Sequence, residues 1–306
     1  MIGFILRRIL VTIPVILGVS TLTFMLIHFV PGDPVDIMLG EQASALDKSA
    51  LRHELGLDRP LSEQYWSFLT GLARGDLGRS LHSKAPVRDE IWARLPATFE
   101  LTLGAISLAI LLGIPMGVLA AIRQYSWLDN SVLLGGLLGM SVPGFFLGPM
   151  LILIFSIQLD WFPVSERGGL AHLVLPATSL AFALGAILMR MTRASMLEVV
   201  KSDYITVARA KGVHPFRLFF HHALRNALMP IITTLGLQFG ALLTGTVITE
   251  TIFDWPGVGT LFYSAIQQRN YPLVQGCVLF IALTYVMVNL LTDLAYAAAN
   301  PQVRFA

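Results

Sequence analysis

Six long stretches without any Asp, Glu, Lys or Arg constrain the fold of this chain more than any other feature. They contain 22 to 30 residues each and cover 9–32, 101–122, 130–159, 168–189, 226–249 and 270–292. A helix rises about 1.5 Å per residue, so about 20 apolar residues cross the roughly 30 Å hydrocarbon core of a bilayer. A backbone exposed to lipid must satisfy its own polar groups, which a helix does. The sequence therefore predicts an all-α polytopic membrane protein with six transmembrane helices.

The composition agrees with this architecture and excludes other classes. Only 13% of the 306 residues are charged and 55% are hydrophobic, whereas soluble domains carry about 25% charged residues. A soluble enzyme and a disordered chain are excluded, and a net charge of +2 gives no reason to expect a nucleic-acid partner. The single cysteine, Cys277, excludes an intramolecular disulfide and leaves no CxxC pair for zinc.

Basic residues indicate the orientation. Of the 21 Lys and Arg residues, eleven fall in loops on one side and two in short loops on the other. The remaining eight lie in the segment 31–96, which is long enough to be translocated regardless of its charge. Both termini are therefore expected in the cytoplasm. The expected divisions are an N-terminal transmembrane helix at 1–30, a periplasmic segment with short helices at 31–96, a core of five helices at 97–297 and a cytoplasmic tail at 298–306.

The cytoplasmic segment 190–225 carries seven basic and two acidic residues, too many for a hidden span. Helix-forming residues run from Ser195 to Lys211, after which Gly212 offers a stop and Pro215 a first-turn start. We expect a helix, a tight break and a short helix outside the membrane. Anchoring to anionic membrane lipid is one use for such a segment.

The sequence of this segment also resembles a known family. The letters DYITVARAKG at 203–212 and HALRNALMP at 222–230 resemble the coupling loop of ABC importer permeases, with Gly212 and His222 at the family spacing. The dipeptide, oligopeptide and nickel branch is most similar, in the permease subunit with a long first periplasmic loop. Further matching motifs are RR at 7–8, PGDP at 31–34, GDLG at 75–78, PAT at 96–98, IFDWPGVG at 252–259 and NPQVR at 300–304. Two departures, Asn270 and Asn300, stand where the branch usually has Asp.

The resemblance implies a type I ABC importer permease in the bacterial inner membrane. It implies three kinds of partner: a second homologous permease forming a heterodimer, two cytoplasmic ABC ATPases and a periplasmic solute-binding protein. Membrane lipid is the fourth expected partner, as the spans themselves indicate. ATP and Mg would be bound by the ATPases, with no cofactor in this chain. The implied coupling loop spans 190–229. Its implied ATPase-coupling residues are Asp203, Tyr204, Ala208, Arg209, Ala210, Lys211, Gly212 and His222.

Those residue types suit docking on a partner. The small Ala208, Ala210 and Gly212 allow close backbone approach, while Arg209 and Lys211 can meet acidic groups. The His222 side chain is expected to hydrogen-bond across the break between the two short helices.

Rival function classes lack their motifs. The chain has no G-x-x-x-x-G-K-[ST] loop for a nucleotide, no H-E-x-x-H and no G-x-S-x-G, so we expect no enzyme. An ion-coupled carrier would be expected to show charges within its spans, which are nearly free of them.

Polar residues within the spans are the candidates for the translocation path. These are Gln238, Thr244, Thr284 and Asn289. So few polar groups suit a conduit whose solute is selected by a separate binding protein. The resemblance implies small peptides or peptide-like solutes of the dipeptide, oligopeptide or glutathione class. Nickel transport is the alternative within the family, although the seven histidines are scattered and predict no metal site.

Overall fold

The computed structural model covers residues 1–306 and describes 2–29, 34–39, 43–54 and 56–299. Within these residues the regular structure is helical, apart from an isolated bridge between Arg79 and Pro86. The helices before the core are α1 (Ile2–Phe29), α2 (Pro34–Leu39), α3 (Ala45–Glu54) and α4 (Leu61–Ala73). The next are α5 (Val87–Ile122), α6 (Trp127–Ser141), α7 (Gly144–Leu151), the π-helix η1 (Ile152–Gln158) and α8 (Leu170–Val200). The last are α9 (Asp203–Ala210), α10 (Pro215–Arg217), the π-helix η2 (Leu218–Ala223), α11 (Leu224–Ile252), α12 (Val258–Gln267) and α13 (Tyr271–Ala299).

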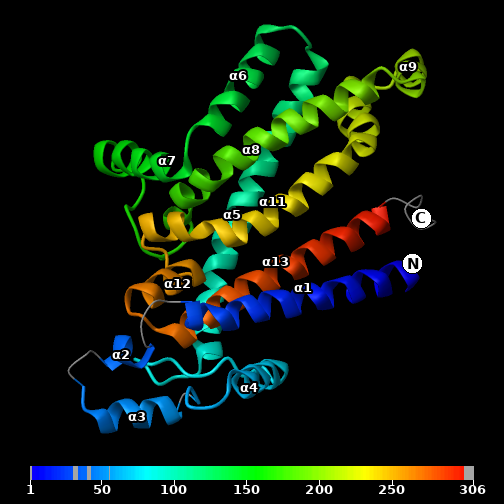
Figure 1. Cartoon of the computed structure of the whole chain (residues 1–306). Helices are drawn as coiled ribbons and strands as arrows, with labels where there is room; N and C mark the ends of the chain where they lie inside the picture. The colour runs from blue at the N-terminus through cyan, green and yellow to red at the C-terminus, as the bar shows by residue number, and fades with distance from the viewer. Residues whose placement is uncertain (1, 30–33, 40–42, 55, 300–306) are drawn as a thin grey trace.

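The long helices form one packed body (Figure 1). Helix α8 packs against α5, α6 and α11, and α13 packs between α11 and α1. Helices α2, α3 and α4 lie at one end of this body, and α9 lies at the other.

Three helices are continuous, long and apolar enough to cross a membrane: Val87–Ile122, Leu170–Val200 and the portion Tyr271–Thr292 of α13. The number rises to five if each of two bent helix pairs is one span, and Leu10–Met25 within α1 forms a shorter apolar helix. The stretch 130–159 is one of these bent pairs, because α6 and the α7–η1 unit meet at 103°. Val142 precedes Pro143 and is extended at φ −82° and ψ 117°, as a residue before proline prefers.

Two boundaries differ from those expected from the sequence. The division between 96 and 97 falls inside α5, which begins at Val87 and continues through Pro96 as a single helix of 36 residues. Glu100 ends the charge-free stretch, but Glu100 is half-buried and the charges at Arg88, Asp89 and Glu90 are exposed or half-buried, so the helix extends past them. The division between 297 and 298 falls inside α13, which continues to Ala299, and residues 300–306 of the expected tail, including Asn300, lie outside the described residues.

Close packing of α5 on α8 depends on two glycines. A Cβ atom on Gly113 would lie 2.8 Å from the carbonyl oxygen of Gly185, and one on Gly117 would lie 2.6 Å from that of Met189. Both contacts are with backbone atoms, which cannot move aside. These two glycines therefore allow the helices to approach within this chain.

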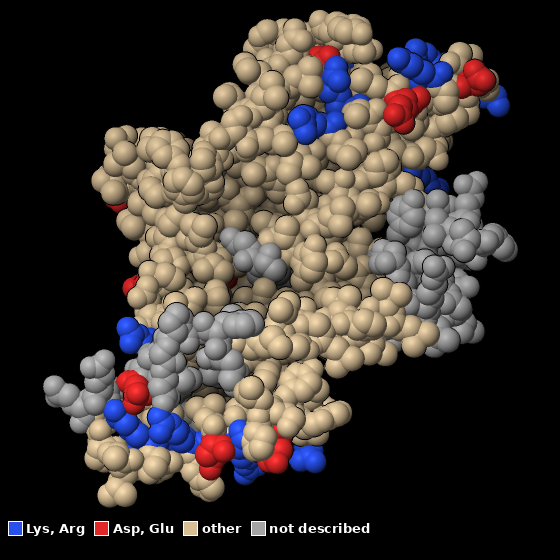
Figure 2. Space-filling model, in the orientation of Figure 1, with Lys and Arg blue, Asp and Glu red and all other residues tan. Residues whose placement is uncertain are grey.

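Charged residues gather at the two ends of the molecule. On the face in Figure 2, Lys, Arg, Asp and Glu lie mainly near α9 and near α2–α4, separated by a broad band of other residues.

Asn270 joins the segment before α5 to the turn before α13. Its side chain donates to Ser80 Oγ at 2.8 Å and accepts from the Leu81 N–H at 3.2 Å.

Candidate functional site

The predicted coupling segment begins with a break that the helix-forming pattern did not indicate. We expected one helix from Ser195 to Lys211, but α8 ends at Val200 and α9 begins at Asp203. Between them Ser202 is extended at φ −74° and ψ 151°. Its hydroxyl donates to the carbonyl of Val199 at 2.5 Å, and such local bonding competes with helix continuation. Asp203 then occupies the first turn, where the helix dipole favours an acidic group.

Helix α9 ends as predicted, before Gly212. The Gly212 N–H donates to Arg209 O at 3.0 Å and the Val213 N–H donates to Ala208 O at 3.2 Å. This pair of bonds is a Schellman motif, which needs a left-handed residue at its centre, and Gly212 has φ +74°. The next helix starts at Pro215, also as predicted. Glycine is thus required here by backbone conformation.

Apolar packing fixes the segment to the ends of the long helices. Ile205 is fully buried, and Leu218 is 2% exposed. They form one cluster with the buried residues Val118, Ala121, Met196, Phe219, Ala223 and Ala227. Since these residues come from α5, α8, α9, η2 and α11, α9 packs directly on the ends of three long helices.

The opposite face of α9 presents charged and small groups to solvent. Asp203, Arg209, Ala210, Lys211 and Gly212 are exposed. Ala208 instead packs against the apolar cluster. The structure thus brings together seven of the eight predicted coupling residues, Asp203 to Gly212, at one protruding tip, with Ala208 turned inward.

The hydrogen bond across the break comes from a residue that the sequence reasoning missed. Asn226 Nδ2 donates to Tyr204 Oη at 2.7 Å, and so joins α11 to α9. We expected the His222 side chain in this role. Its ring instead lies edge-on to His221, with centroids 5.2 Å apart, and its carbonyl accepts from Asn226 at 3.3 Å. Asn226 directly follows Arg225, the last basic residue of the segment, and that position was the one sign in the sequence that could have pointed to it.

An ion pair joins the neighbouring helices α6 and α8. Arg193 Nε lies 2.5 Å from Asp129 Oδ1, and Nη2 lies 2.8 Å from Oδ2, which makes the pair bidentate. Asp129 is 1% exposed and also accepts from the Tyr125 N–H at 2.9 Å. A bidentate guanidinium fixes orientation as well as distance. The pair therefore orients α6 on α8.

The candidates for the translocation path lie on α11 and α13. Gln238 and Thr284 are half-buried, and the Thr284 hydroxyl donates to Phe280 O at 2.8 Å within its own helix. Asn289 lines a cavity of about 220 Å³ with Val11, Thr12 and Tyr285 among others, and its Oδ1 is buried without a hydrogen-bond partner. The side chain of Thr244 lies outside the described ones.

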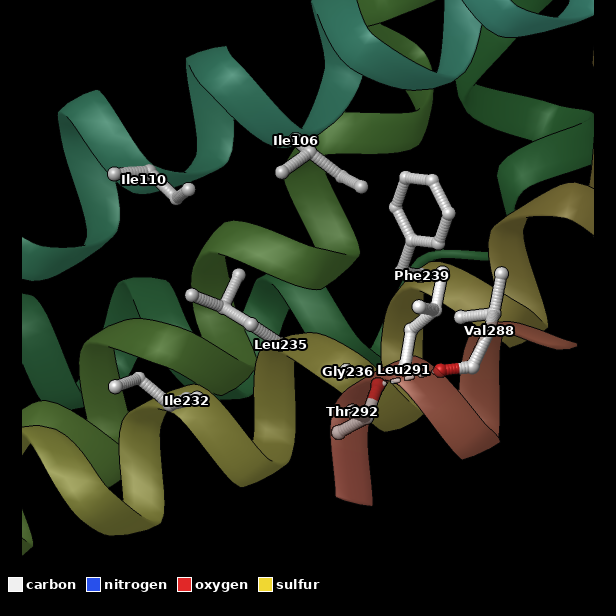
Figure 3. A pocket seen from close by; sticks show the side chains of 9 residues that line it. All are labelled: Ile106, Ile110, Ile232, Leu235, Gly236, Phe239, Val288, Leu291 and Thr292. Carbon is white, nitrogen blue, oxygen red and sulfur yellow. Dashed lines mark hydrogen bonds between the residues drawn. The ribbon is translucent and has the colours of Figure 1, made fainter. Parts of the chain in front are cut away.

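A second cavity between α5, α11 and α13 holds none of these candidates. It measures about 320 Å³ and is lined by the nine residues labelled in Figure 3, of which Thr292 has the only side-chain heteroatom. The Thr292 hydroxyl donates to Val288 O at 2.8 Å. The predicted path residues and this cavity are therefore separate features of the same helices.

A buried carboxylate at the other end of the molecule was not singled out from the sequence. Glu250 is fully buried where α11 ends. Its Oε1 accepts from the Thr98 hydroxyl at 2.7 Å and its Oε2 from the Thr260 N–H at 3.0 Å. The Thr98 oxygen in turn accepts from the Val258 N–H at 2.8 Å. These bonds join α5, α11 and α12; we call Thr98, Glu250, Trp255, Gly257 and Thr260 the outer corner.

Packing around the outer corner leaves little space. Trp255 is fully buried and donates from Nε1 to Ala97 O at 2.7 Å. A Cβ atom on Gly257 would overlap the carboxylate of Glu250. The signal in the sequence was a single carboxylate directly after the charge-free stretch 226–249 and before WPGVG. Within the described residues, no group of three or more His, Cys, Asp or Glu could hold a metal ion.

Family models match nearly the whole chain. One described as "Binding-protein-dependent transport system inner membrane component" matches residues 113–305. A second, for the N-terminal part of such components, matches residues 1–102.

Individual proteins are similar over their full length. The chain is 41% identical over 305 residues to a glutathione transport system permease protein of Pectobacterium atrosepticum, with 100% of both chains covered. It is 43% identical over an alignment of 336 positions to a dipeptide transport system permease protein of Escherichia coli, with 99% of both chains covered. It is 42% identical over an alignment of 334 positions to a di/tripeptide transport system permease protein of Pseudomonas aeruginosa, again with 99% of both chains covered.

A solved structure shows the same fold. A chain of the MetNI methionine ABC transporter, in an inward-facing conformation, has a TM-score of 0.55 and 16% identity. The likeness covers 69% of this chain and 96% of the other.

Proposed function

Since the chain belongs to the family of binding-protein-dependent transport system inner membrane components, we propose that it is the permease subunit of an ATP-driven importer of small peptides or peptide-like solutes. The observation that carries this proposal is the identity of 41–43%, over the full chain, to permeases named for glutathione, dipeptides and di/tripeptides. Dipeptides, oligopeptides and glutathione share a peptide backbone, and that is the solute class proposed.

The proposed topology has six spans and both termini in the cytoplasm of a bacterium, with the chain in the inner membrane. Its periplasmic part is 31–96 and its coupling loop 190–229. The distribution of basic residues supports this orientation. Exposed acidic and basic groups at the two ends of the molecule, with a band of other residues between, agree with it (Figure 2).

The proposed complex contains a second homologous permease, two ABC ATPases and a periplasmic binding protein. The ATPases would bind ATP and Mg, so the free energy for transport would come from those subunits and not from this chain. The tip at Asp203–Ala210, with Lys211 and Gly212, is proposed to insert into an ATPase. Its apolar base on Ile205 and Leu218 would carry the ATPase movement into α5, α8 and α11.

Uptake measurements test the proposal. Cells lacking this chain are given labelled di- and tripeptides, with nickel uptake measured beside them. We expect loss of peptide uptake alone, restored by the intact chain. Loss of nickel uptake alone would keep the permease assignment and contradict the peptide class.

Two variants of one residue test the coupling role. Gly212→Asp places a negative charge at the tip, whereas Gly212→Asn has the same size and the same tolerance of positive φ without the charge. Nothing lies within 4 Å of a Cβ atom there, so neither variant meets a steric obstacle. We expect Gly212→Asp to insert into the membrane but to lose most uptake, with Gly212→Asn close to normal. Normal uptake in Gly212→Asp would contradict the docking role.

A further inference from the structure

A pocket beside the outer corner carries charges of both signs. It measures about 450 Å³ and is lined by Arg94, Glu166, Arg167, Asp254, Pro256, Thr260, Leu261 and Ser264. Three segments contribute these residues: the start of α5, the loop before α8, and the turn from α11 into α12 together with α12 itself. In Figure 1, α12 and the start of α5 lie at the end of the molecule opposite to α9.

Three of the four charged side chains in the pocket have no ion-pair partner among the described residues. These are Arg94, Glu166 and Asp254, all of them exposed. Arg167 is different, because its Nη2 pairs with Glu100 Oε2 at 2.7 Å. A protein that keeps an unpaired guanidinium and two unpaired carboxylates around one hollow has groups available for opposite charges on another molecule.

The backbone holds two of these carboxylates in an uncommon conformation. Glu166 has φ +73° and Asp254 has φ +48°, in the left-handed region that residues other than glycine rarely adopt. The Glu166 N–H donates to Phe253 O at 3.0 Å, so the two acidic residues are tied to each other through the backbone. Strain of this kind persists where surrounding structure imposes it, and it gathers at functional sites.

The outer corner supplies that surrounding structure. Thr260 lines the pocket and its N–H binds the buried Glu250 carboxylate at 3.0 Å. Trp255, fully buried, lies directly between the pocket residues Asp254 and Pro256 in the chain. The charges are therefore presented on a rigid frame, and preorganisation reduces the entropic cost of binding.

The exposure of the charges decides what kind of molecule fits. A small-solute site buries most of its ligand among apolar walls, with a few converging polar groups. Here all four charged side chains are exposed, so a free peptide would stay largely hydrated. Exposed charges instead suit the rim of a protein interface, where they set the association rate and the orientation.

We infer that this pocket is a docking site for the solute-binding protein of the transporter, whose docking surface carries an acidic group for Arg94 and a basic group for Glu166 and Asp254. The inference depends on the proposed function for the existence of that partner, which the family description itself names. It assigns the docking contact to particular residues of this chain.

Binding of the transporter's purified solute-binding protein to the complete complex in nanodiscs tests the inference. We expect Arg94→Glu and Asp254→Lys each to raise the dissociation constant at least about tenfold, because each variant opposes like charges. The neutral variants Arg94→Gln and Asp254→Asn should raise it less, and they keep the test informative if a reversal prevents assembly. Arg74→Glu, at another exposed arginine before α5, is the matched control and should leave binding unchanged.

A salt titration and an uptake assay complete the test. The dissociation constant of the wild type should rise with NaCl, and that of Arg94→Gln should rise less steeply. In spheroplasts with added binding protein, the variants should need more of that protein for half-maximal dialanine uptake and should reach the normal maximum rate.

Unchanged binding of the solute-binding protein by the variants, or a lower maximum rate of uptake with normal binding, would overturn the inference. The inference would also be overturned if the complex bound labelled dialanine without the binding protein and Arg94→Glu abolished that binding. If the complex binds the protein but carries no peptide, the proposed solute class is wrong and the docking site is retained.

Discussion

The two ends of this permease are attached to the membrane helices by different physical means. At one end, which we call the α9 end, α9 lies on an apolar cluster around Ile205 and Leu218, with one side-chain hydrogen bond from Asn226 to Tyr204. At the outer corner, the α11–α12 turn is held by directed hydrogen bonds to one buried carboxylate, Glu250.

This difference matters because the two kinds of attachment tolerate movement differently. Apolar contacts are non-directional, so α9 can tilt by small amounts and remain packed. Hydrogen bonds weaken steeply as the donor–hydrogen–acceptor angle departs from linear. The bonds of the outer corner therefore hold in one geometry and are lost if its helices move relative to each other. A segment that transmits a partner's movement suits the first design, and a frame that presents a fixed pocket suits the second.

The largest effect is expected from Glu250→Leu. The change leaves the Thr98 hydroxyl and the Thr260 N–H without their acceptor, and an orphaned buried donor costs about 1–3 kcal/mol. We expect the free energy of unfolding, measured by SDS titration of the full chain in bicelles, to fall by about 4 kcal/mol.

Glu250→Gln is the matched control, because one amide oxygen can still accept one of the two bonds. It should lose about half as much stability. Equal stability of Glu250→Leu and wild type would show that apolar contacts hold the outer corner too, and the contrast between the ends would disappear.

The next effect is expected at the α9 end. Ile205→Ala removes a fully buried side chain, and such truncations cost about 2–5 kcal/mol. We expect a local loss of about 3 kcal/mol. Amide hydrogen exchange in α9 should accelerate, and ATP hydrolysis in the complex should continue with reduced uptake. Val207→Ala, on the exposed side of the same helix, should change neither; equal effects of both variants would contradict the packing argument.

A smaller effect is expected from Trp255→Phe. The smaller ring cannot donate to Ala97 O, so the side-chain bond that links Trp255 to α5 is lost, and the smaller ring also leaves a small void. We expect about 2 kcal/mol of destabilisation by SDS titration. Substituting Trp161, an exposed tryptophan, by Phe provides the baseline for loss of an indole. A change as small as that baseline would mean that the Nε1 bond does not help to hold the outer corner.

Local signals in the sequence predicted local structure well. Gly212 and Pro215 are correctly predicted as the end of one helix and the start of the next, because their backbone preferences act within a few residues. The charge-free stretches likewise predicted where long helices lie. The third stretch is also free of charges throughout, and nothing in its composition indicates the angle of 103° between its two halves, where α6 and α7 pack on α8.

Contacts between distant residues escaped prediction. Thr98 and Glu250 are separated by 152 positions, and nothing near either one indicates the other. Burial of a carboxylate depends on where its partners lie in three dimensions, and composition around it suggested only the end of a span. The same holds for Tyr204 and Asn226, which are 22 positions apart, because nothing near Asn226 in the sequence marks it as the partner of Tyr204.

The smallest effect is expected from that pair, and it sharpens the comparison most. Tyr204→Phe and Asn226→Ala should each cost about 1 kcal/mol, the usual contribution of one hydrogen bond. Because each variant removes the same bond, the double variant should cost little more than either single one in a double-mutant cycle. The readout is amide exchange in α9, which should accelerate about fivefold. Full additivity would mean that the two groups do not interact, so that apolar packing alone holds the α9 end.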